Sequence, residues 1–474
     1  MPPRNRRILL ISLVVGFACA VQAARLRHVR DVALVMDYVD SLYVEPIERQ
    51  QLGYRAISGM LEGLDPYSGF ISPEDMSQFR SQLEQNFTGL GIVIRKDDSG
   101  LIAIERAIPG GPAVDAGLRA GDRIVSIDGV STAELNIQDA SVRLRGPSGT
   151  SVLLSTLPAG EEIPRPVTVI RGIVETPSVV GDRRGEDGRP VYRLQADPRI
   201  AYIHLSIFGE QSTREMQDFL TANADDAAAA IIDLRANAGG LLETAKSICD
   251  MFLHEGVIVS VEGRLPQERT ILTAEPGVLL DPAKPLVLLV DGDSASASEV
   301  VAACLQDLGR AKVAGSRSYG KGSVQTIIEL DGGRAALRLT TAHWFSPQRR
   351  KISRPAEPDP EDTWGVDPDQ ELIVEVTDLQ RAAAFDRLRR RDAGDLEPAA
   401  EEKQTDDSSP PAPEPAAEAG AAGAADTNAV EAKFDISTLA EPTKLEKLLQ
   451  ADPTLREDPQ LLRVAAWLQD QIDG

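Results

Sequence analysis

The sequence predicts a multidomain α/β protein, and three observations lead to that class. A chain of 474 residues, 42% of them hydrophobic, can bury more than one core. From Phe87 to about Arg171, short β-like runs are separated by turn signals. Beyond Pro177, strand and helix patterns alternate, which is typical of a core with a largely parallel sheet.

The N-terminal residues have the order of an export signal. Arg4, Arg6 and Arg7 precede the apolar run 8–20 and the small-residue site "VQAA". This order is typical of a secretory signal peptide, which we assign to residues 1–23. We therefore expect a periplasmic or cell-envelope location, with the signal either cleaved or retained as a membrane anchor.

A helical region is predicted at 24–85. Apolar residues recur at i, i+3, i+4 and i+7 between Val32 and Tyr43, and a second helical pattern covers 54–64 before the turn signal "DPYSG". The apolar faces of these helices predict packing within the protein or against a second copy. We accordingly expect a homo-oligomer.

The charge of the chain argues against one large class of partner. The formal net charge is -23, whereas nucleic-acid binding relies on clustered Lys and Arg. The sequence has no HExxH motif and no cluster of Cys and His, so neither a metal nor a cofactor is expected. Cys249 and Cys304 lie in apolar helical patterns and are expected to be buried free thiols.

Two motifs stand in the β-rich segment. It opens with "FTGLGIVI" and continues with "GGPAVDAGLRAGDRIVSIDG", and with these motifs it resembles a PDZ domain. A Gly-Leu-Gly loop before an edge strand can expose backbone N–H groups to the terminal carboxylate of a peptide that adds to the sheet. The resemblance implies a PDZ domain at 86–174, with Gly89, Leu90, Gly91 and Ile92 as peptide-binding residues.

A candidate nucleophile lies in "VLLVDGDSASASEVVAACLQDL", which passes from a buried strand through a small-residue turn into a helix. A serine in this turn would lie at a helix N-terminus, where developing negative charge is favoured. The alternative is a serine-rich helix cap without chemistry. On either interpretation, Ser294 and Ser298 are expected to be turn and cap residues.

Two distant motifs favour the nucleophile. "IIDLRANAGGLL" ends a strand in a glycine pair before a helix, and such a pair can present free N–H groups to an oxyanion. "GSRSYGKGSVQ" places Lys321 between glycines after a strand. Because burial lowers the pKa of a lysine by up to roughly 3 to 5 units, this amine could act as a base.

Taken together, these three motifs resemble those of the C-terminal processing peptidases, the tail-specific proteases with a serine-lysine dyad. The resemblance extends from the N-terminal helices to about Asp369. It implies a crotonase-like α/β protease core at 175–394, an inserted, mostly β PDZ domain, and helical segments at both ends. The implied activity is that of a serine endopeptidase that cuts proteins near their C-termini. Its substrates would be proteins or peptides with free C-termini, and an adaptor protein could deliver them.

The family pattern also assigns roles to single residues. It places the nucleophile at Ser296, the general base at Lys321 and a supporting glutamine at Gln325. Glu299 matches a polar residue that supports the site. The other matching positions are the oxyanion-hole donors, Ala297 and one of Gly239 or Gly240, and a residue that in some members couples a bound tail to the catalytic domain, Arg145. The chain departs from the pattern at Ala238, where the family usually has proline.

Two other functions deserve comparison. A crotonase-like acyl-CoA enzyme would also use glycine-loop amides, but CoA chemistry is intracellular and needs no reader of peptide ends. A catalytically inactive PDZ scaffold in the cell envelope would not need both Ser296 and Lys321. The four histidines stand in no motif that suggests a triad.

The C-terminal part combines a linker with helices. Residues 395–435 are an acidic mixture with Ala and Pro that cannot bury enough apolar surface to fold, so we expect a disordered linker. A helical segment at 436–474 follows. Thr443 and Glu446 are spaced as a capping box for its first helix, and Asp458 precedes Pro459 as a cap for its second.

Overall fold

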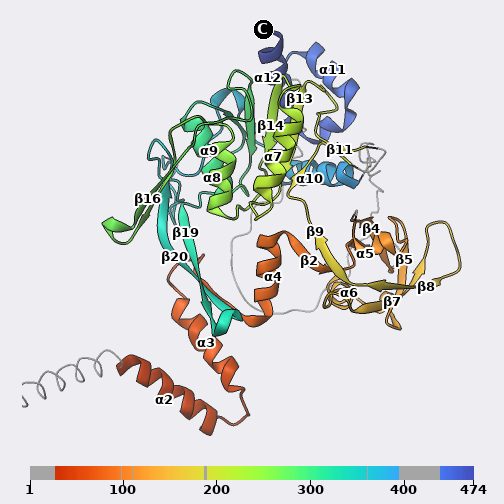
Figure 1. The fold of residues 1–474 in the computed structure, drawn as a ribbon, viewed down its shortest axis with the longest axis vertical. Coiled ribbons are helices and arrows are strands. Elements are labelled where there is room, and N and C mark those ends of the chain that lie inside the picture. Colours follow the sequence, from red (N-terminus) through yellow and green to blue (C-terminus); the bar gives the residue numbers. More distant parts are fainter. Residues whose placement is uncertain (1–26, 98, 109, 186–188, 360, 394–437) are drawn as a thin grey trace, which may run out of the picture. The chain divides into compact units, whose positions relative to one another are not determined.

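The computed structural model describes residues 27–97, 99–108, 110–185, 189–359, 361–393 and 438–474 (Figure 1). The chain divides into two compact units, one with the residues up to Ser77 and Val324–Thr341, the other with Gln78–Ser323 and Ala342–Gly474. The predicted signal peptide (1–23) and linker (395–435) lie outside the described residues. None of the described helices has the length and apolar character needed to cross a membrane.

The first unit contains the predicted N-terminal helices. Its elements are α2 (Arg27–Leu42), α3 (Arg49–Leu61), β1 (Gly69–Ile71) and the beginning of α4 (Pro73–Glu84). Strand β1 pairs antiparallel with residues 336–338, at the start of β20 (Ala335–Phe345). The apolar side of α2 is exposed in this chain, with Val29, Val35 and Leu42 at 63%, 59% and 76%. The partner expected for this face stays a prediction.

The predicted PDZ segment forms a β-rich module of the second unit. Its main sheet is antiparallel in the order β3-β4-β5-β7-β8, so β3 is an edge strand. The bounds are β2 (Asn86–Gly89), β3 (Ile92–Lys96), β4 (Ile102–Ala107), α5 (Pro112–Asp115), β5 (Arg123–Ile127), β6 (Val130–Ser131), α6 (Ile137–Leu144), β7 (Ser151–Leu157), β8 (Arg165–Ile170) and β9 (Gly172–Glu175). Strands β2 and β9 pair as a separate ribbon.

A five-stranded sheet forms the predicted α/β core. The strand order is β10-β13-β14-β17-β18, and all pairs except β10 with β13 are parallel. The bounds are β10 (Val179–Val180), β13 (Ile200–Leu205), α7 (Ser212–Asn223), β14 (Ala229–Asp233), α8 (Leu242–Asp250), β17 (Leu286–Val290), α9 (Ala297–Asp307) and β18 (Lys312–Gly315). Every residue of β13, β14 and β17 is buried, as expected for parallel strands covered on both faces.

The core region contains further strand pairs and two buried thiols. Strands β15 (Val257–Gly263) and β16 (Arg269–Thr273) pair with each other, and β15 also pairs with the end of β20. Strand β19 (Ser323–Leu330) pairs with β20 around the turn at Asp331–Gly333, and β11 (Arg183–Arg184) pairs with β12 (Pro190–Val191). Cys249 and Cys304 are buried and free, which confirms that prediction.

The C-terminal helices cover one face of the parallel sheet. The segment contains α11 (Pro442–Ala451) and α12 (Pro459–Asp473), and α10 (Asp378–Ala393) precedes the predicted linker (Figure 1). Apolar residues of α11 and α12 share one buried cluster with side chains of β13, β14 and β17, including Tyr202, Ile231 and Leu289. The segment is therefore part of the core and not an appendage.

One of the two predicted helix caps is confirmed. The Asp458 carboxylate accepts a hydrogen bond from Leu461 N–H at 3.0 Å, and Pro459 is the first residue of α12. The capping box at Thr443 was a wrong prediction, because α11 already begins at Pro442. Proline is favoured at the first helical position, where its missing N–H costs nothing.

Candidate active site

Three neighbouring parallel strands end at the same edge of the core sheet. Strands β14, β17 and β18 are adjacent and parallel. The glycine pair follows β14, Ser296 follows β17, and Lys321 lies in the connection from β18 to β19. Since the carboxyl ends of parallel strands meet at one edge of a sheet, the fold brings together three motifs that are far apart in the sequence.

Ser296 lies at the junction of the turn and α9 in an uncommon backbone conformation. Its φ and ψ are 56° and -112°, a region that non-glycine residues rarely adopt. Ser296 and Glu299 have the arrangement of a capping box at the start of α9, and the well-formed bond of this box is the one that the Glu299 carboxylate accepts. The N–H of Ser296 donates to Oε2 of Glu299 at 2.8 Å. The backbone of Ser296 is thus fixed by Glu299, and its side chain is half-buried.

Glu299 connects two segments of the site. One is the turn before α9 that holds the candidate nucleophile (291–296, the nucleophile turn), and the other is the loop that holds Lys321 (316–322). Its Oε2 accepts from the N–H groups of Ser296 and Lys321, both at 2.8 Å, so the two backbone nitrogens lie within twice that distance of each other. Its Oε1 accepts from the Ser318 hydroxyl and from Gly320 N–H, both at 2.6 Å. Burial raises the pKa of Glu299, while these hydrogen bonds oppose the rise.

Lys321 has a glycine on each side for steric reasons. Gly320 has φ +91°, and a Cβ there would lie 2.7 Å from Trp364. A Cβ at Gly322 would lie 2.5 Å from the Ser353 hydroxyl. The carbonyl of Lys321 accepts from the indole N–H of Trp344 at 3.0 Å, and its side chain is half-buried. The tight packing of the two glycines fixes the course of the chain on both sides of the lysine.

Asn237 joins the glycine loop to the nucleophile turn. Its carbonyl accepts from Ala295 N–H at 3.0 Å and from the Ser298 hydroxyl at 2.8 Å. Ser294 makes a second link, because its hydroxyl donates to Leu234 O at 2.8 Å. Ser294 is thus a turn residue, as predicted, because its hydroxyl also accepts from Asp291 N–H. Ser298 is not a cap residue: it lies inside α9, whose N-cap is Ser296, and its hydroxyl fixes the helix against the loop.

The two glycines of the loop differ in what their N–H groups do. Gly239 N–H donates to Oδ1 of Asn237 at 2.9 Å. Gly240 forms a parallel bridge with Phe208 in which the flanking residues make the hydrogen bonds, so its own N–H points the other way. Among the described residues, neither Gly240 N–H nor Ala297 N–H has a hydrogen-bond partner. The sequence alone did not show which of the two glycine N–H groups would be unpaired.

The glycine loop and the nucleophile turn are in close contact. A Cβ at Gly239, where φ is +101°, would lie 2.8 Å from the Cβ of Ser296 and 2.9 Å from Ala297 N. Only glycine allows this approach. The structure therefore brings together Ser296, Ala297 and the glycine pair, and Glu299 adds the backbone of Lys321 to the same group.

Gln325 belongs to the other compact unit. It lies in β19, and its side-chain amide donates to the Thr340 hydroxyl at 3.3 Å. Thr340 in turn donates to Asp65 at 3.1 Å. The supporting role of Gln325 next to Lys321 stays a prediction. Among the described residues, no group of His, Cys, Asp and Glu is arranged to hold a metal ion.

All five residues predicted to read a peptide lie around one pocket of the PDZ module. The pocket has a volume of about 120 Å³ and is lined by Phe87, Gly89, Leu90, Gly91, Ile92, Ile94, Ser141, Leu144 and Arg145. It lies between edge strand β3 and helix α6, and Arg145 caps the end of α6. Among the described residues, Leu90 N–H and Gly91 N–H have no hydrogen-bond partner. Such donors beside an edge strand suit the terminal carboxylate of an added strand.

Comparison with known proteins decides the family. The model described as peptidase family S41 matches residues 199–372, and a PDZ-domain model matches residues 104–157. A carboxy-terminal-processing protease of Bartonella bacilliformis is 37% identical over 67% of this chain and 71% of its own length. The chain belongs to the carboxy-terminal-processing proteases. A second relative from Synechocystis sp., a carboxyl-terminal-processing protease, is 33% identical over 72% of this chain and 78% of its own length.

This carboxy-terminal-processing protease is a serine-type peptidase with a PDZ domain and a mixed α/β fold. The solved structure of photosystem II D1 C-terminal processing protease is 28% identical to it over 72% of this chain and 86% of that chain, with a TM-score of 0.40. The crotonase-like arrangement of the core and the predicted domain boundaries stay predictions.

Sequence reasoning missed several residues that support the protease site. Asn237 and Ser318 are buried polar residues that organise the loops, and Asp291 accepts from Ala236 N–H at 3.0 Å. Asp291 directly follows β17, and Asn237 and Ser318 lie within four positions of the ends of β14 and β18, which could have indicated them. Arg235 and Asp458 could not have been paired in this way, because 223 positions separate them in the sequence.

Proposed function

We propose that the protein is an exported serine endopeptidase that cleaves proteins near their C-termini. In this proposal Ser296 is the nucleophile, Lys321 is the general base and Gln325 supports the lysine. The N–H groups of Ala297 and Gly240 bind the oxyanion. The PDZ domain binds the free C-terminus of the substrate.

The observation that carries the proposal is the bridging role of Glu299. One buried carboxylate accepts hydrogen bonds from the backbone of the serine and from that of the lysine. A residue that served only to cap α9 would need the first of these bonds and not the second. The two-sided contact is what a site requires if the serine and the lysine must act together.

The chemistry follows from these assignments. The neutral amine of Lys321 takes the proton of the Ser296 hydroxyl as Oγ attacks the scissile carbonyl carbon. The carbonyl oxygen becomes an oxyanion held by the two free N–H groups, and each such donor is worth about 100- to 1,000-fold in rate. The lysine ammonium then gives its proton to the leaving amine. A water molecule hydrolyses the acyl-enzyme by the same steps, and Ser296 regains its proton.

The choice of Gly240 over Gly239 rests on hydrogen bonding. Gly239 N–H is engaged by Asn237, whereas Gly240 N–H is unpaired among the described residues. An unpaired donor can bind an oxyanion without first breaking a bond. Pre-formed donors of this kind need no reorganisation when charge develops.

The export proposal rests on the sequence, because residues 1–26 lie outside the described part. A catalytically inactive scaffold is the alternative. The strained backbone of Ser296 speaks against it, because a conformation that costs about 1 to 3 kcal/mol is retained where it has a use.

The decisive test is substitution of the two proposed catalytic groups. Ser296→Ala and Lys321→Ala should each reduce peptide cleavage by about 10,000-fold or more, since the residues act as a unit. Thermal unfolding should stay close to that of the wild type, because neither side chain is fully buried. Cleavage is measured with a fluorogenic peptide.

Ser294→Ala is the matched control on the same turn. It should lower stability, because a buried hydroxyl that donates to Leu234 is lost, and it should reduce cleavage far less than Ser296→Ala, because the proposed nucleophile is kept. Turnover by purified Ser296→Ala near the wild-type rate would refute the proposed nucleophile.

A further inference from the structure

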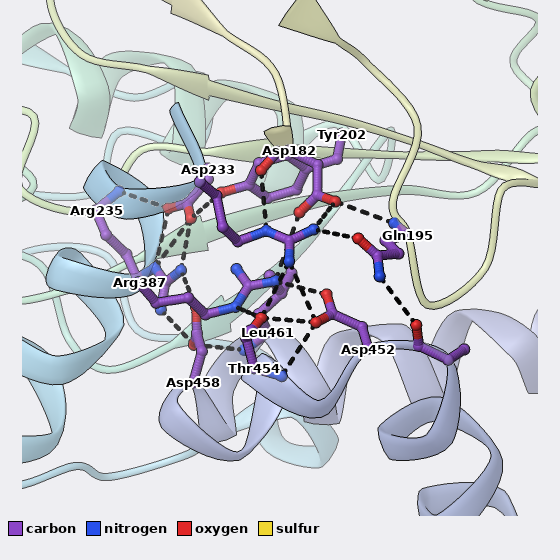
Figure 2. A network of polar contacts seen from close by, with 12 residues as sticks. Asp182, Gln195, Tyr202, Asp233, Arg235, Arg387, Asp452, Thr454, Asp458 and Leu461 are labelled. Carbon is purple, nitrogen blue, oxygen red and sulfur yellow. Dashed lines mark hydrogen bonds and ion pairs between the residues drawn. The ribbon is translucent and has the colours of Figure 1, made fainter. Parts of the chain in front are cut away.

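A buried network of charged residues joins the C-terminal segment to the protease core (Figure 2). It contains three arginines and four aspartates, namely Arg235, Arg387, Arg391, Asp182, Asp233, Asp452 and Asp458. All seven side chains are 8% exposed or less. Only Asp452 and Asp458 belong to the C-terminal segment, so this segment supplies two of the four carboxylates.

Arg235 uses its guanidinium to connect two parts of the chain. Its Nε and Nη2 donate to Asp233 at 3.0 and 2.6 Å. Its Nη1 and Nη2 donate to the two carboxylate oxygens of Asp458 at 2.7 and 2.8 Å, and Nη1 also reaches Gln460 at 3.3 Å. Every N–H of the guanidinium thus has an acceptor, which fixes the side chain in one geometry.

The backbone of Arg235 begins the loop that carries the oxyanion donor. Its carbonyl accepts from His204 Nε2 at 3.1 Å. The next residue, Ala236, has φ +51°, and its N–H is held by Asp291 at 3.0 Å. The loop then passes through Asn237 to the glycine pair. A strained residue keeps its conformation only if the residues around it are fixed, so the anchoring of Arg235 bears on the position of Gly240.

We propose that the C-terminal helical segment positions the glycine loop of the active site through the ion pair between Asp458 and Arg235. Asp458 and Arg235 are positioning residues, since neither lies among the proposed reacting groups. The inference rests on the proposed function, in which the glycine loop binds the oxyanion. In this inference, the C-terminal helical segment affects kcat although it is far in sequence from the proposed catalytic residues.

Asp452 offers a close match for a control. Like Asp458, it is fully buried, and like Asp458 it caps a helical turn of the C-terminal segment, accepting from Thr454 N–H at 3.1 Å. It also pairs with arginines outside the segment, but these are Arg387 and Arg391 of α10. The two aspartates therefore differ mainly in which arginine they hold.

The test compares Asp458→Asn with Asp452→Asn in the full-length protein. Asparagine keeps the size and the capping oxygen in both variants but removes the charge. Both should unfold at lower temperature, because each leaves a buried arginine short of a partner. Asp458→Asn should in addition lower kcat by about 10- to 100-fold with KM within about twofold, because a misplaced donor weakens only the transition state. Asp452→Asn should keep kcat within about twofold.

A second pair of variants covers the case in which Asp458→Asn does not fold. Arg235→Lys keeps the positive charge in the network but loses the bidentate hydrogen bonds to Asp458. Arg387→Lys makes the same substitution in α10. Only Arg235→Lys should lower kcat. All rates are measured at a temperature where circular dichroism shows each variant to be folded.

The outcomes separate the inference from the function on which it rests. If the Asp458 and Asp452 variants lose stability alike and keep the same kcat, the segment only stabilises the fold and the inference is refuted. An equal loss of kcat in both variants refutes it as well. Ser296→Ala, assayed alongside, tests the proposed function by itself: activity in that variant overturns the nucleophile, whatever the aspartate variants do.

Discussion

The backbone of Ser296 has an unfavourable conformation that the surrounding residues maintain. A φ of 56° costs a serine about 1 to 3 kcal/mol, which the surrounding hydrogen bonds must offset. Glu299 makes the largest visible contribution, because its carboxylate holds Ser296 N–H and three further donors. The proposed nucleophile and the carboxylate that holds it are therefore one structural feature.

Glu299→Gln is expected to lower kcat by at least about tenfold. Both carboxylate oxygens face donors, so an amide NH₂ would oppose N–H groups or a hydroxyl, and an unmet buried donor costs about 1 to 3 kcal/mol. Because burial raises the pKa of Glu299, the wild type gains a proton at higher pH than an ordinary glutamate and then also loses an acceptor. The ratio of wild-type to variant kcat should shrink as the pH falls through that raised pKa.

An exposed glutamate on the neighbouring helix provides the control. Glu243→Gln, in the first turn of α8, should leave kcat and its pH profile unchanged. A constant ratio for Glu299→Gln between pH 5 and pH 9 would argue that this carboxylate does not titrate in the working enzyme.

Single residues were predictable from the sequence only where a motif marked them. "SASAS" and "GKG" pointed to Ser296 and Lys321 by resemblance, and the structure adds the contact that joins their backbones. Glu299 was expected to support the site, but its four hydrogen bonds come from segments about twenty positions apart. No local pattern contains that information.

The glycine loop (234–241) contacts the nucleophile turn and carries the proposed oxyanion donor Gly240. It links β14 to α8, and its contacts with the nucleophile turn leave no room for a side chain at Gly239. The sequence predicted that a glycine pair would expose N–H groups. It could not tell which glycine would do so, because that depends on the bridge to Phe208 and on Asn237.

Gly239→Ala should reduce kcat by about 100-fold or more, as expected when a proposed oxyanion donor is displaced. The added methyl would lie 2.7 Å from Ala295 O and 2.8 Å from Ser296 Cβ, so the loop or the turn must move. Gly309→Ala is the control: φ there is also positive, at +67°, but the space beside it is open. The control should lose stability and keep kcat. Similar kcat values for the two variants would contradict the close contact.

At the scale of the whole molecule, a PDZ module and a protease core share one chain. The order of strands and helices was readable from the sequence, because parallel strands give continuous apolar runs and the PDZ segment has its own turn spacing. Contacts across long stretches of sequence were not readable. The pairing of Asp458 with Arg235 depends on how α12 docks, which no local propensity determines.

Amidating the C-terminus of a good peptide substrate should raise KM by about tenfold or more. A charge-assisted hydrogen bond to a backbone N–H is worth about 1.5 to 3 kcal/mol, and 1.4 kcal/mol corresponds to tenfold in affinity. The proposed donors are Leu90 N–H and Gly91 N–H, beside Arg145 in the pocket. Cleavage kinetics of the acid and amide forms provide the measurement.

A peptide in which an internal glutamate becomes glutamine controls for net charge. It loses one negative charge but keeps its terminal carboxylate, so its KM should stay near that of the parent. Equal effects of the two changes would mean that the pocket responds to charge in general. Arg145→Ala should reduce the difference between the acid and amide forms if Arg145 helps to read the carboxylate.

The positions of Asp452 and Asp458 in the sequence affect the order in which parts of the protein can fold. A chain is made from its N-terminal side, so the PDZ module and all proposed catalytic residues emerge before these two aspartates. Until they arrive, Arg387 and Arg391 have only Asp182 as a carboxylate partner in the network, and one face of the parallel sheet lacks its apolar cover. A core that closed on that incomplete set would be destabilised, because uncompensated buried charge is costly. We therefore expect the native protease core to be completed only when the C-terminal segment docks, which comes after the PDZ module and the proposed catalytic residues have been made.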